Sequence, residues 1–539
     1  MTRSRAVGLL VVLAACTTAG PTAGPADRPH PAADRVVESR LCSLPPSHVL
    51  RTWRGYRPGR SGQIQMIPKE PNFVGEWLSH SGPWPYVQRI PLFLYGPGHV
   101  PASGRVRGPA TLADVAPTIA AHLEFPFRAR DGRALDRALG SSPTPPRLVV
   151  VVVWDGGGRN VLTEHPRAWP TLRRLIPEGT WFEDAVVGTS PSVTPAVHAT
   201  IGTGAFPRRH GVVDLKFLFE GRLASINEET PRYQIEPTMA DRYDRARGNR
   251  PVVGLAAPLG TLGMVGRGSL LPAGDRDVAA IERDGLWQLD PLQRPYFRFP
   301  AARPTELGDR QSAEVDASDG RRDGTWLGSP VEGDPAILSK TPAFSVHQAR
   351  FLRDLIVTEG FGRDRVPDLL FTNFKQIDGV AHEWSMNSPQ MEAVVRSSDR
   401  ALGDLVRTLD RFVGRRRWVL ALTADHGSTP RPELTGAFAI SLPRLERDLD
   451  AAFDADEDGR PAIRDLRVTQ MWVDPDELAE NGHTLDEVSR FLMRYSEGQN
   501  AEVPVDPERA DRPVFEAAFP SELLETASCV HRGAGETID

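Results

Sequence analysis

The stretch RLVVVVVWDGGG, residues 147–158, decides the fold class of this chain. Its apolar run has no alternating polar side chains, which predicts a strand buried on both faces, as in a parallel sheet. The run ends at Asp155, and glycines follow at once. Because parallel sheets place their sites at the carboxyl ends of the strands, we expect Asp155 to lie at a functional edge.

Further stretches of the same kind are RIPLFLYGPG (89–98), PDLLFTNFKQID (367–378) and RRWVLALTADHG (416–427). Helical patterns lie between them, for example apolar residues at helical spacing between Met391 and Phe412. Alternation of strands and helices predicts an α/β fold with a mostly parallel central sheet flanked by helices.

The composition fits a globular protein with a substantial core, since 40% of the 539 residues are hydrophobic and 25% are charged. The formal net charge is −6 and there is no long basic run. We therefore expect no nucleic-acid binding.

The first 16 residues have the pattern of a bacterial lipoprotein signal peptide. Arg3 and Arg5 precede an apolar run that is too short to span a membrane. The tetrad LAAC (13–16) resembles a lipobox, which would put a lipid on Cys16 and anchor the chain to a membrane; ordinary secretion is the alternative. We expect an exported cell-surface lipoprotein. The preference for Arg over Lys suggests a bacterium with a GC-rich genome.

Composition also suggests boundaries along the chain. Residues 17–40 are rich in Pro, Ala and Asp and predict a disordered tether. The linker GSSPTPPR (140–147) separates a folded segment, 41–139, from the main part, 148–539. From about 214 to 345 the pattern weakens, which predicts an inserted cap region over the site; a surface elaboration is the alternative.

Acidic residues stand at the ends of the predicted strands. Asp155 ends one strand, Asp378 follows another four residues before His382, and Asp425 with His426 ends a third. A parallel sheet brings these ends to one edge, and carboxylate and imidazole groups suit zinc. A single Asp after a strand is more often a helix cap, but their joint occurrence favours a metal site.

A candidate nucleophile lies in GTSPSVTPAVHATIGTGAFPRRHG, residues 188–211. Thr194 precedes Pro195 at the start of a helix-like stretch. A hydroxyl there is ordinarily a helix N-cap. The functional alternative is a metal-activated nucleophile, with the helix N-terminus favouring a bound anion.

In this order, the motifs around Asp155, Thr194, DGVAH and DHG resemble the alkaline phosphatase superfamily, and most closely its nucleotide pyrophosphatase/phosphodiesterase branch. The matching segments cover most of residues 147–430. The resemblance implies an alkaline-phosphatase-like fold and hydrolysis of a small phosphoester through a Thr nucleophile and two zinc ions, although manganese or iron suits similar ligands. It assigns Asp155, Asp425 and His426 to one ion, Asp378 and His382 to the other, and Thr194 to a position between them.

The family requires one more histidine, in a context that closes with a strand and Gly-Pro-Gly. His483 and His531 lie downstream of DHG but lack that context, whereas residues 79–98 have it and contain His80. The resemblance therefore assigns His80 as the missing ligand and implies a circularly permuted chain, in which 41–139 corresponds to the family's C-terminal part. A separate N-terminal module with a coincidental histidine is the alternative.

The remaining cysteines, Cys42 and Cys529, lie near opposite ends of the mature chain. Export favours a disulfide between them, and two unpaired thiols are the alternative. In a permuted chain, such a disulfide would close the new opening.

The chain departs from the family pattern near the nucleophile. Val197 stands where many family members have an Asn that donates to the phosphate, so Asn373 or Lys375 would have to contact the substrate instead. No Arg directly follows the nucleophile, which favours diesters over monoesters. We expect His198 and His210 to serve in packing and turn formation and not as ligands.

An acidic loop copies the spacing of a calcium site. Its oxygen ligands would be Asp454, Asp456, Asp458 and Asp465. We expect a solvated acidic turn, and a calcium site is the alternative. For the whole chain, the alternatives to a phosphodiesterase are a phosphomonoesterase or phosphoryl transferase with the same site, or a surface binding protein on a decayed hydrolase fold.

Overall fold

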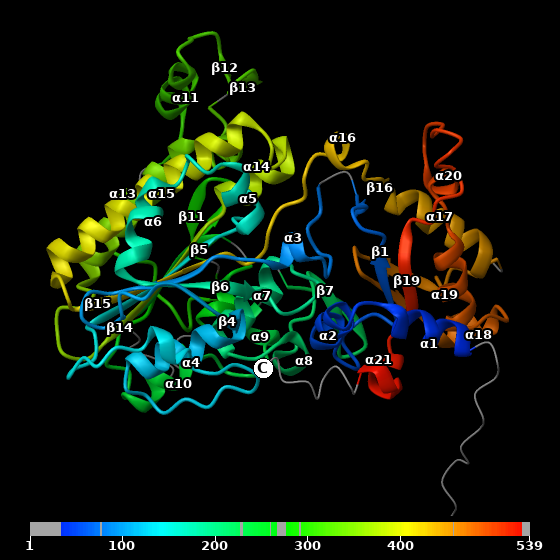
Figure 1. The fold of residues 1–539 in the computed structure, drawn as a ribbon, viewed down its shortest axis with the longest axis horizontal. Helices are drawn as coiled ribbons and strands as arrows, with labels where there is room; N and C mark the ends of the chain where they lie inside the picture. Colours follow the sequence, from blue (N-terminus) through cyan, green and yellow to red (C-terminus); the bar gives the residue numbers. More distant parts are fainter. Residues whose placement is uncertain are drawn as a thin grey trace, which may run out of the picture.

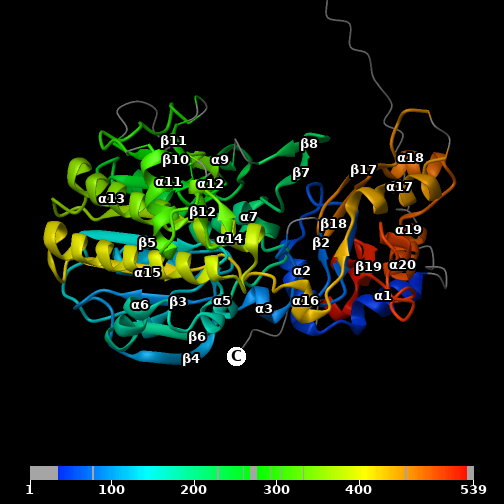
Figure 2. The same cartoon turned by 90° about the horizontal axis from the view of Figure 1, so that it is seen from above.

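The computed structural model describes residues 34–530 except 76–77, 227–229, 259, 267–275, 290, 292, 305, 332 and 456–457. The predicted signal peptide, with Cys16, lies outside these residues. The chain forms a larger lobe around a nine-stranded sheet and a smaller lobe around a four-stranded sheet (Figure 1, Figure 2). Within the described part of the chain, no helix combines the length and apolar character that crossing a bilayer requires.

The central sheet confirms the predicted mostly parallel α/β fold. Its strands follow the order β11 (Leu286–Gln288), β10 (Val278–Arg283), β9 (Val253–Pro258), β14 (Asp368–Phe374), β5 (Leu148–Trp154), β15 (Trp418–Thr423), β3 (Leu92–Tyr95), β6 (Thr180–Val186) and β4 (Gly104–Thr111). Only β3 and β11 run against the others. Strand β3 was expected to be like the parallel strands, but residue pattern alone does not set strand direction.

Both faces of β5 are covered, as its apolar run predicts. Val150 and Val152 pack into one core, and Val149 and Val151 pack into the other. The first core includes α5 (Arg159–Glu164), α6 (Pro170–Leu175), α13 (Pro342–Glu359), α14 (Gln376–Trp384) and α15 (Pro389–Leu409). The second includes α4 (Val115–His122), α7 (Thr194–Thr203), α10 (Met239–Ala246) and the turn η4 (Leu262–Met264).

The smaller lobe joins the two ends of the described chain. Its antiparallel sheet has the order β17 (Ile463–Leu466), β18 (Gln470–Val473), β1 (Ile64–Pro68) and β19 (Phe515–Pro520). Its helices are α1 (Asp34–Ser43), α2 (Pro46–Gly55), α17 (Leu442–Phe453), α18 (Pro475–Glu480), α19 (Leu485–Arg494), α20 (Glu497–Asn500) and α21 (Leu523–Thr526). A disulfide joins Cys42 to Cys529, with the Cα atoms 5.5 Å apart.

Short strands and helices outside the two main sheets connect the lobes or lie on their surfaces. They are β2 (Phe73–Val74) paired with β16 (Ala439–Ile440), the hairpin of β7 (Lys216–Phe219) and β8 (Arg222–Ser225), β12 (Thr325–Trp326) paired with β13 (Ser329–Pro330), and the helices α3 (Pro85–Gln88), α8 (Pro207–His210), α9 (Thr230–Tyr233), α11 (Asp309–Asp316), α12 (Pro335–Leu338) and α16 (Pro432–Thr435). In Figure 1, α11, β12 and β13 project from the larger lobe.

Two predicted boundaries differ from the structure. Helix α1 begins at Asp34, inside the expected tether (17–40), because Val37 and Leu41 are buried in the core of the smaller lobe. The expected insertion at about 214–345 contains β9, β10 and β11 of the central sheet. Their short runs, VGLAAP and VAAIER, are rich in Ala and contain two bulky apolar residues each, a weaker strand signal than the run before Asp155.

Candidate active site

Three neighbouring strands bring carboxylates to one edge of the central sheet. Asp155 follows β5, Asp425 follows β15, and Asp378 lies in the first turn of α14, just beyond β14. Strands β14, β5 and β15 are adjacent and parallel, so their carboxyl ends meet. Each of these Asp residues is at most 1% exposed, which places three carboxylates in a buried cluster.

The residues assigned to two metal ions come together here. The groups whose ligand atoms lie within 4.8 Å of one another are His80, Asp378 and His382; Asp155, Asp378 and His426; and Asp155, His198 and Asp425. Asp378 Oδ1, Asp425 Oδ2 and His426 Nε2 are buried and have no hydrogen-bond partner. Buried acceptors without donors are unfavourable, and divalent cations would satisfy them. The set of nitrogen and oxygen ligands fits zinc.

His80 reaches the site from the loop before α3. Its ring stacks on His426 with centroids 3.5 Å apart, and its Nε2 lies 3.5 Å from Asp378 Oδ1. Its Nδ1 donates to the Ser192 carbonyl at 3.2 Å. The lone pair of Nε2 therefore points toward the other candidate metal ligands, Asp378 and His382. The Ser192 hydroxyl donates back to the His80 carbonyl at 2.7 Å. The His80 loop is thereby fastened to the segment that precedes Thr194.

Burial favours the metal-binding form of these imidazoles. Burial, with the neighbouring His426, holds the pKa of His80 well below its usual value. Burial also lowers the pKa of His426. Both rings are therefore neutral near pH 7, which is the state in which imidazole binds metal ions.

Thr194 is the first residue of α7, and the N-cap position belongs to Val193. No side chain caps this helix, so the Thr194 hydroxyl does not play the ordinary capping role. Its Oγ1 instead accepts a hydrogen bond from Lys375 Nζ at 3.3 Å. The hydroxyl thus lies at the helix N-terminus beside a cation.

Lys375 joins the carboxylates to Thr194. Its Nζ lies 2.7 Å from Asp378 Oδ2 and 3.2 Å from Asp155 Oδ1. Burial acts to lower the pKa of Lys375, but the surrounding carboxylates outweigh burial and raise it above its usual value. Burial acts to raise the pKa of Asp378, but His382 and Lys375 hold that pKa well below its usual range. The ammonium and the Asp378 carboxylate are therefore both charged.

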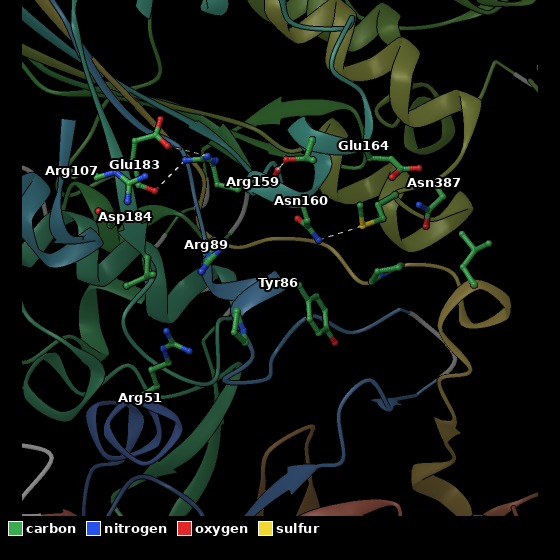
Figure 3. A pocket seen from close by; sticks show the side chains of 16 residues that line it. Arg51, Tyr86, Arg89, Arg107, Arg159, Asn160, Glu164, Glu183, Asp184 and Asn387 are labelled. Atoms are coloured by element: carbon green, nitrogen blue, oxygen red, sulfur yellow. Dashed lines mark hydrogen bonds and ion pairs between the residues drawn. The ribbon is translucent and has the colours of Figure 1, made fainter. Parts of the chain in front are cut away.

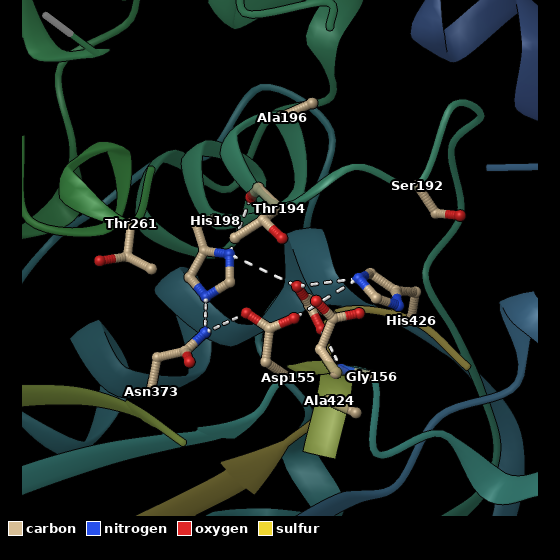
Figure 4. A network of polar contacts seen from close by, with 12 residues as sticks. Asp155, Gly156, Ser192, Thr194, Ala196, His198, Thr261, Asn373, Ala424 and His426 are labelled. Atoms are coloured by element: carbon tan, nitrogen blue, oxygen red, sulfur yellow. Dashed lines mark hydrogen bonds and ion pairs between the residues drawn. The ribbon is translucent and has the colours of Figure 1, made fainter. Parts of the chain in front are cut away.

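Asn373, which the sequence suggested as a substrate contact, lies in a buried hydrogen-bond chain. Its fully buried amide donates to Asp155 Oδ2 and to His198 Nε2, each at 2.8 Å (Figure 4). His198 Nδ1 in turn donates to the Thr194 carbonyl at 2.8 Å. Both His198 nitrogens are thus occupied, and the ring orients its neighbours without offering a free lone pair. Motif spacing did not reveal this series of hydrogen bonds, because the series depends on the direction of the Asn373 side chain at the end of its strand.

The remaining motif residues have structural roles. Val197 is buried in the core that covers one face of the sheet. His210 is buried, contacts Thr200 Oγ1 at 3.1 Å and accepts from the Val212 N–H at 3.1 Å. The site thus contains no donor at position 197, and Lys375 is the cation that contacts the Thr194 hydroxyl.

A cavity of about 570 Å³ opens onto the site. Lys375, Asp378 and His382 line its inner side, and Glu282 and Lys340 line the side formed by the expected insertion. The part of the chain around 282–284 and 336–340 therefore borders the site. The sequence did not identify Glu282 or Lys340, because the weak pattern there gave no motif.

The described residues of the candidate calcium loop do not converge. Asp454 Oδ2 accepts from the Ala462 N–H at 3.2 Å, and Asp458 Oδ1 accepts from the Arg460 N–H at 2.7 Å. Asp465 lies on β17 and pairs with Lys216 and Arg467, each at 3.2 Å. Asp456 lies outside the described residues. Among those described, none of these Asp residues belongs to a group of potential metal ligands.

Comparisons with known proteins were made for the whole chain. The family model described as type I phosphodiesterase / nucleotide pyrophosphatase matches residues 149–523. A relative named calcium-transporting ATPase, from Myroides odoratus, is 23% identical over 340 residues, which are 53% of this chain and 61% of the relative. Alkaline phosphatase PhoV of Synechococcus elongatus is 24% identical over 312 residues, 48% of this chain and 55% of that protein. This chain thus spans less than two thirds of either relative.

Among solved structures, a crystal structure of wild-type alkaline phosphatase PafA superposes with a TM-score of 0.49 and 17% identity. The superposition covers 70% of this chain and 85% of that one.

Proposed function

The chain belongs to the type I phosphodiesterase / nucleotide pyrophosphatase family, as its motifs indicated, and we propose that it hydrolyses phosphoric esters with Thr194 as nucleophile between two divalent metal ions. The observation that carries the proposal is the position of the Thr194 hydroxyl. It is not used as a helix cap and lies beside Lys375 at the edge of a buried group of carboxylates and imidazoles.

The ligand atoms divide between two ions. Asp155, Asp425 and His426 would hold one ion, and Asp378, His382 and His80 would hold the other. When bound, two zinc ions supply positive charge for the attacking and leaving oxygens of an in-line displacement. The unpartnered buried atoms of Asp378, Asp425 and His426 support this assignment.

The residues of the chain perform the remaining steps. The Thr194 hydroxyl gives up its proton to water and its oxygen attacks phosphorus. The ester bond to the leaving oxygen breaks, the leaving oxygen takes a proton from water, and a phosphothreonine remains. Water then cleaves the phosphothreonine and restores the hydroxyl. Lys375 Nζ, 3.3 Å from the nucleophile, donates to a phosphoryl oxygen and so takes the place of the donor missing at Val197.

We assign diesters as the preferred substrates. Pro195 follows the nucleophile where a monoesterase would carry an Arg clamp for two free phosphate oxygens. A monoesterase or phosphoryl transferase is the second candidate. It is favoured by Lys375 beside Thr194 and by the name of the alkaline phosphatase relative.

The test compares hydrolysis of bis(4-nitrophenyl) phosphate and 4-nitrophenyl phosphate by the zinc-loaded chain. We expect faster hydrolysis of the diester. Thr194→Ala should lose at least about 10³-fold in kcat, because the nucleophile is removed. Thr194→Ser keeps a hydroxyl and is the matched control. A faster monoester reaction would identify a phosphatase, and a metal-loaded chain without turnover on either ester would identify a binding protein.

We further propose export and anchoring through a lipid on Cys16. The disulfide between Cys42 and Cys529 supports export, because disulfides persist in oxidising compartments. Cys16→Ser should release the chain from the membrane fraction. Recovery of this variant in the membrane fraction would contradict the anchor.

We also propose that the chain order is a circular permutation of the family's order. Strand β3, which follows His80, pairs with β15, which precedes Asp425, so the early segment lies beside the late motif. Chain ends that lie close together permit such rearrangement. A chain rebuilt to begin at residue 148 and carry 41–139 at its C-terminus should fold and keep its activity, whereas an insoluble product would contradict the permutation.

A further inference from the structure

A second cavity, of about 970 Å³, lies where the two lobes meet. Its lining includes Arg51 on α2 of the smaller lobe, and Arg89, Arg107 and Arg159 from the larger lobe (Figure 3). None of the candidate metal ligands lines this cavity. We name it the arginine pocket, defined by these four arginines.

Among the described residues, Arg159 is the one arginine of this pocket that forms an ion pair, with Glu183 at 3.7 Å. Arg51 Nη1 donates to the Pro83 carbonyl, and burial together with Arg54 and Arg89 lowers the pKa of Arg51 to about 10. Arg89 and Arg107 are exposed, and neither forms an ion pair with a described residue. The chain has 70 acidic residues against 64 basic ones, so partners for these arginines are not scarce. Three guanidinium groups without an ion-pair partner among the described residues favour binding of an anion.

The acidic residues of the pocket are already engaged or lie apart. Glu183 pairs with Arg105 at 2.5 Å and with Arg159 at 3.7 Å. Asp184 Oδ2 accepts from the Gly108 N–H at 3.0 Å. In Figure 3, Glu164 lies across the cavity from Arg51 and Arg107. Glu183 and Asp184 lie beside Arg107 in Figure 3, whereas the part of the cavity near Arg51 and Arg89 shows no labelled carboxylate and is positively charged.

We propose that the arginine pocket is a second anion site, which binds a phosphate group, free or esterified. Guanidinium groups offer paired N–H donors that match phosphate oxygens. Tyr86, Val186 and Met386 supply an apolar wall for the organic part of an ester. This site is separate from the catalytic centre and does not depend on the reaction proposed above.

Backbone hydrogen bonds connect the arginine pocket to the segments that follow Asp155 and His426. The Arg89 carbonyl accepts from the Arg159 N–H at 2.9 Å, and the Val87 carbonyl accepts from the Gly427 N–H at 2.8 Å. Gly427 directly follows His426, and Arg159 opens the helix after Asp155. A bound phosphate would therefore hold the segments that carry these metal ligands.

Calorimetric titration of the metal-loaded chain with inorganic phosphate tests the site. We expect two phosphates per chain, one at the metal centre and one in the arginine pocket. In the double variant Arg89→Gln/Arg107→Gln, the affinity of the arginine pocket for phosphate should fall at least tenfold. The titration should then show one phosphate per chain. Both arginines are exposed, so the variant should fold, and its ester hydrolysis in phosphate-free buffer should equal that of the wild type.

The matched control is Arg310→Gln/Arg353→Gln, which removes two exposed charges from ion pairs on α11 and α13. It should still bind two phosphates. An unchanged titration of the pocket variant, or an equal loss in the control, would overturn the site. Titration of Thr194→Ala with glycerol 2-phosphate tests an esterified ligand; pocket binding of either probe supports the proposal, and binding of neither overturns it. If the chain hydrolyses neither ester, the proposed function fails, but phosphate binding in the arginine pocket still stands.

Discussion

Asn373 and His198 link the proposed nucleophile, Thr194, and the proposed metal ligand Asp155 in one hydrogen-bonded chain. Asn373 orients the Asp155 carboxylate by donating to Oδ2, so that Oδ1 faces Lys375 and His426. His198 ties Asn373 to the backbone carbonyl of Thr194. Such partners beyond the ligands themselves commonly set metal affinity and ligand orientation.

Asn373→Ala should therefore weaken metal binding by about 10–100-fold and lower kcat, because Asp155 loses its orienting donor. Competition with a chromophoric chelator measures the affinity. Thr372→Val, on the same strand, is the control, since it removes buried hydrogen bonds to the Ala256 carbonyl and from Gln348. In this variant the Asn373 side chain keeps its contacts with Asp155 and His198. Equal metal affinities for Asn373→Ala and the wild type would show that Asn373 is structural only.

At the residue scale, motif order predicted which residues the structure brings together. Asp155, Asp378 and Asp425 could be placed from the strand ends, because parallel strands share an edge. His80 required the family resemblance, since no local pattern links it to a site that begins 75 residues later at Asp155. The direction of the Asn373 side chain and the absence of a Thr194 cap depend on local geometry and were not predictable.

Helix α7 carries Thr194, and glycines set its distance from η4. A Cβ at Gly202 would lie 2.3 Å from the Met264 carbonyl oxygen, and one at Gly263 would lie 3.0 Å from Ala199 Cβ. The Met264 carbonyl oxygen is a backbone atom and Ala199 Cβ is bonded directly to the backbone, so neither can move aside as the end of a flexible side chain can. The position of α7, and with it the nucleophile, therefore depends on these glycines.

Gly202→Ala should lower the free energy of unfolding by about 1–3 kcal/mol and reduce kcat, because overpacking displaces α7. Gly403→Ala is the matched control in helix α15. Its Cβ would meet Thr171 Cγ2 at an ordinary 3.4 Å, so the substitution should stabilise the chain by about 0.5–1 kcal/mol. Denaturant titration measures both. The prediction fails if the two variants unfold at the same midpoint.

At the element scale, the long apolar runs identified β5, β14 and β15, which form the centre of the sheet. Strands β9 and β10 were not predicted because Ala or Gly occupies many of their buried positions and gives little hydrophobic signal. The direction of strand β3 could not be predicted either, since its antiparallel pairing with β15 depends on tertiary contacts.

Across the whole molecule, the early chain supplies strands to both lobes. β1 lies between β18 and β19 of the smaller sheet, while β3 and β4 belong to the central sheet. The disulfide then links α1 to the end of the described chain across 487 residues of sequence. The smaller lobe thus depends on both ends of the chain remaining together.

Replacing both cysteines, Cys42→Ser/Cys529→Ser, should lower the free energy of unfolding by about 2–5 kcal/mol, because the unfolded chain gains freedom. Denaturant titration followed by circular dichroism would show the loss. Hydrolysis in the absence of denaturant should persist, since no site residue lies near the disulfide in sequence. An unchanged unfolding midpoint would mean that the smaller lobe is held by its core alone.

The proposed metal centre joins segments that lie hundreds of residues apart, and metal content tests that assembly most directly. Mass spectrometry of the gel-filtered, zinc-loaded chain should find about two zinc ions. His80→Ala should retain about one, because Asp378 and His382 alone hold the second ion weakly. His483→Ala, a substitution of a partly exposed histidine beside Glu487, should retain both. Two tightly bound ions in His80→Ala would contradict a site built from both ends of the chain.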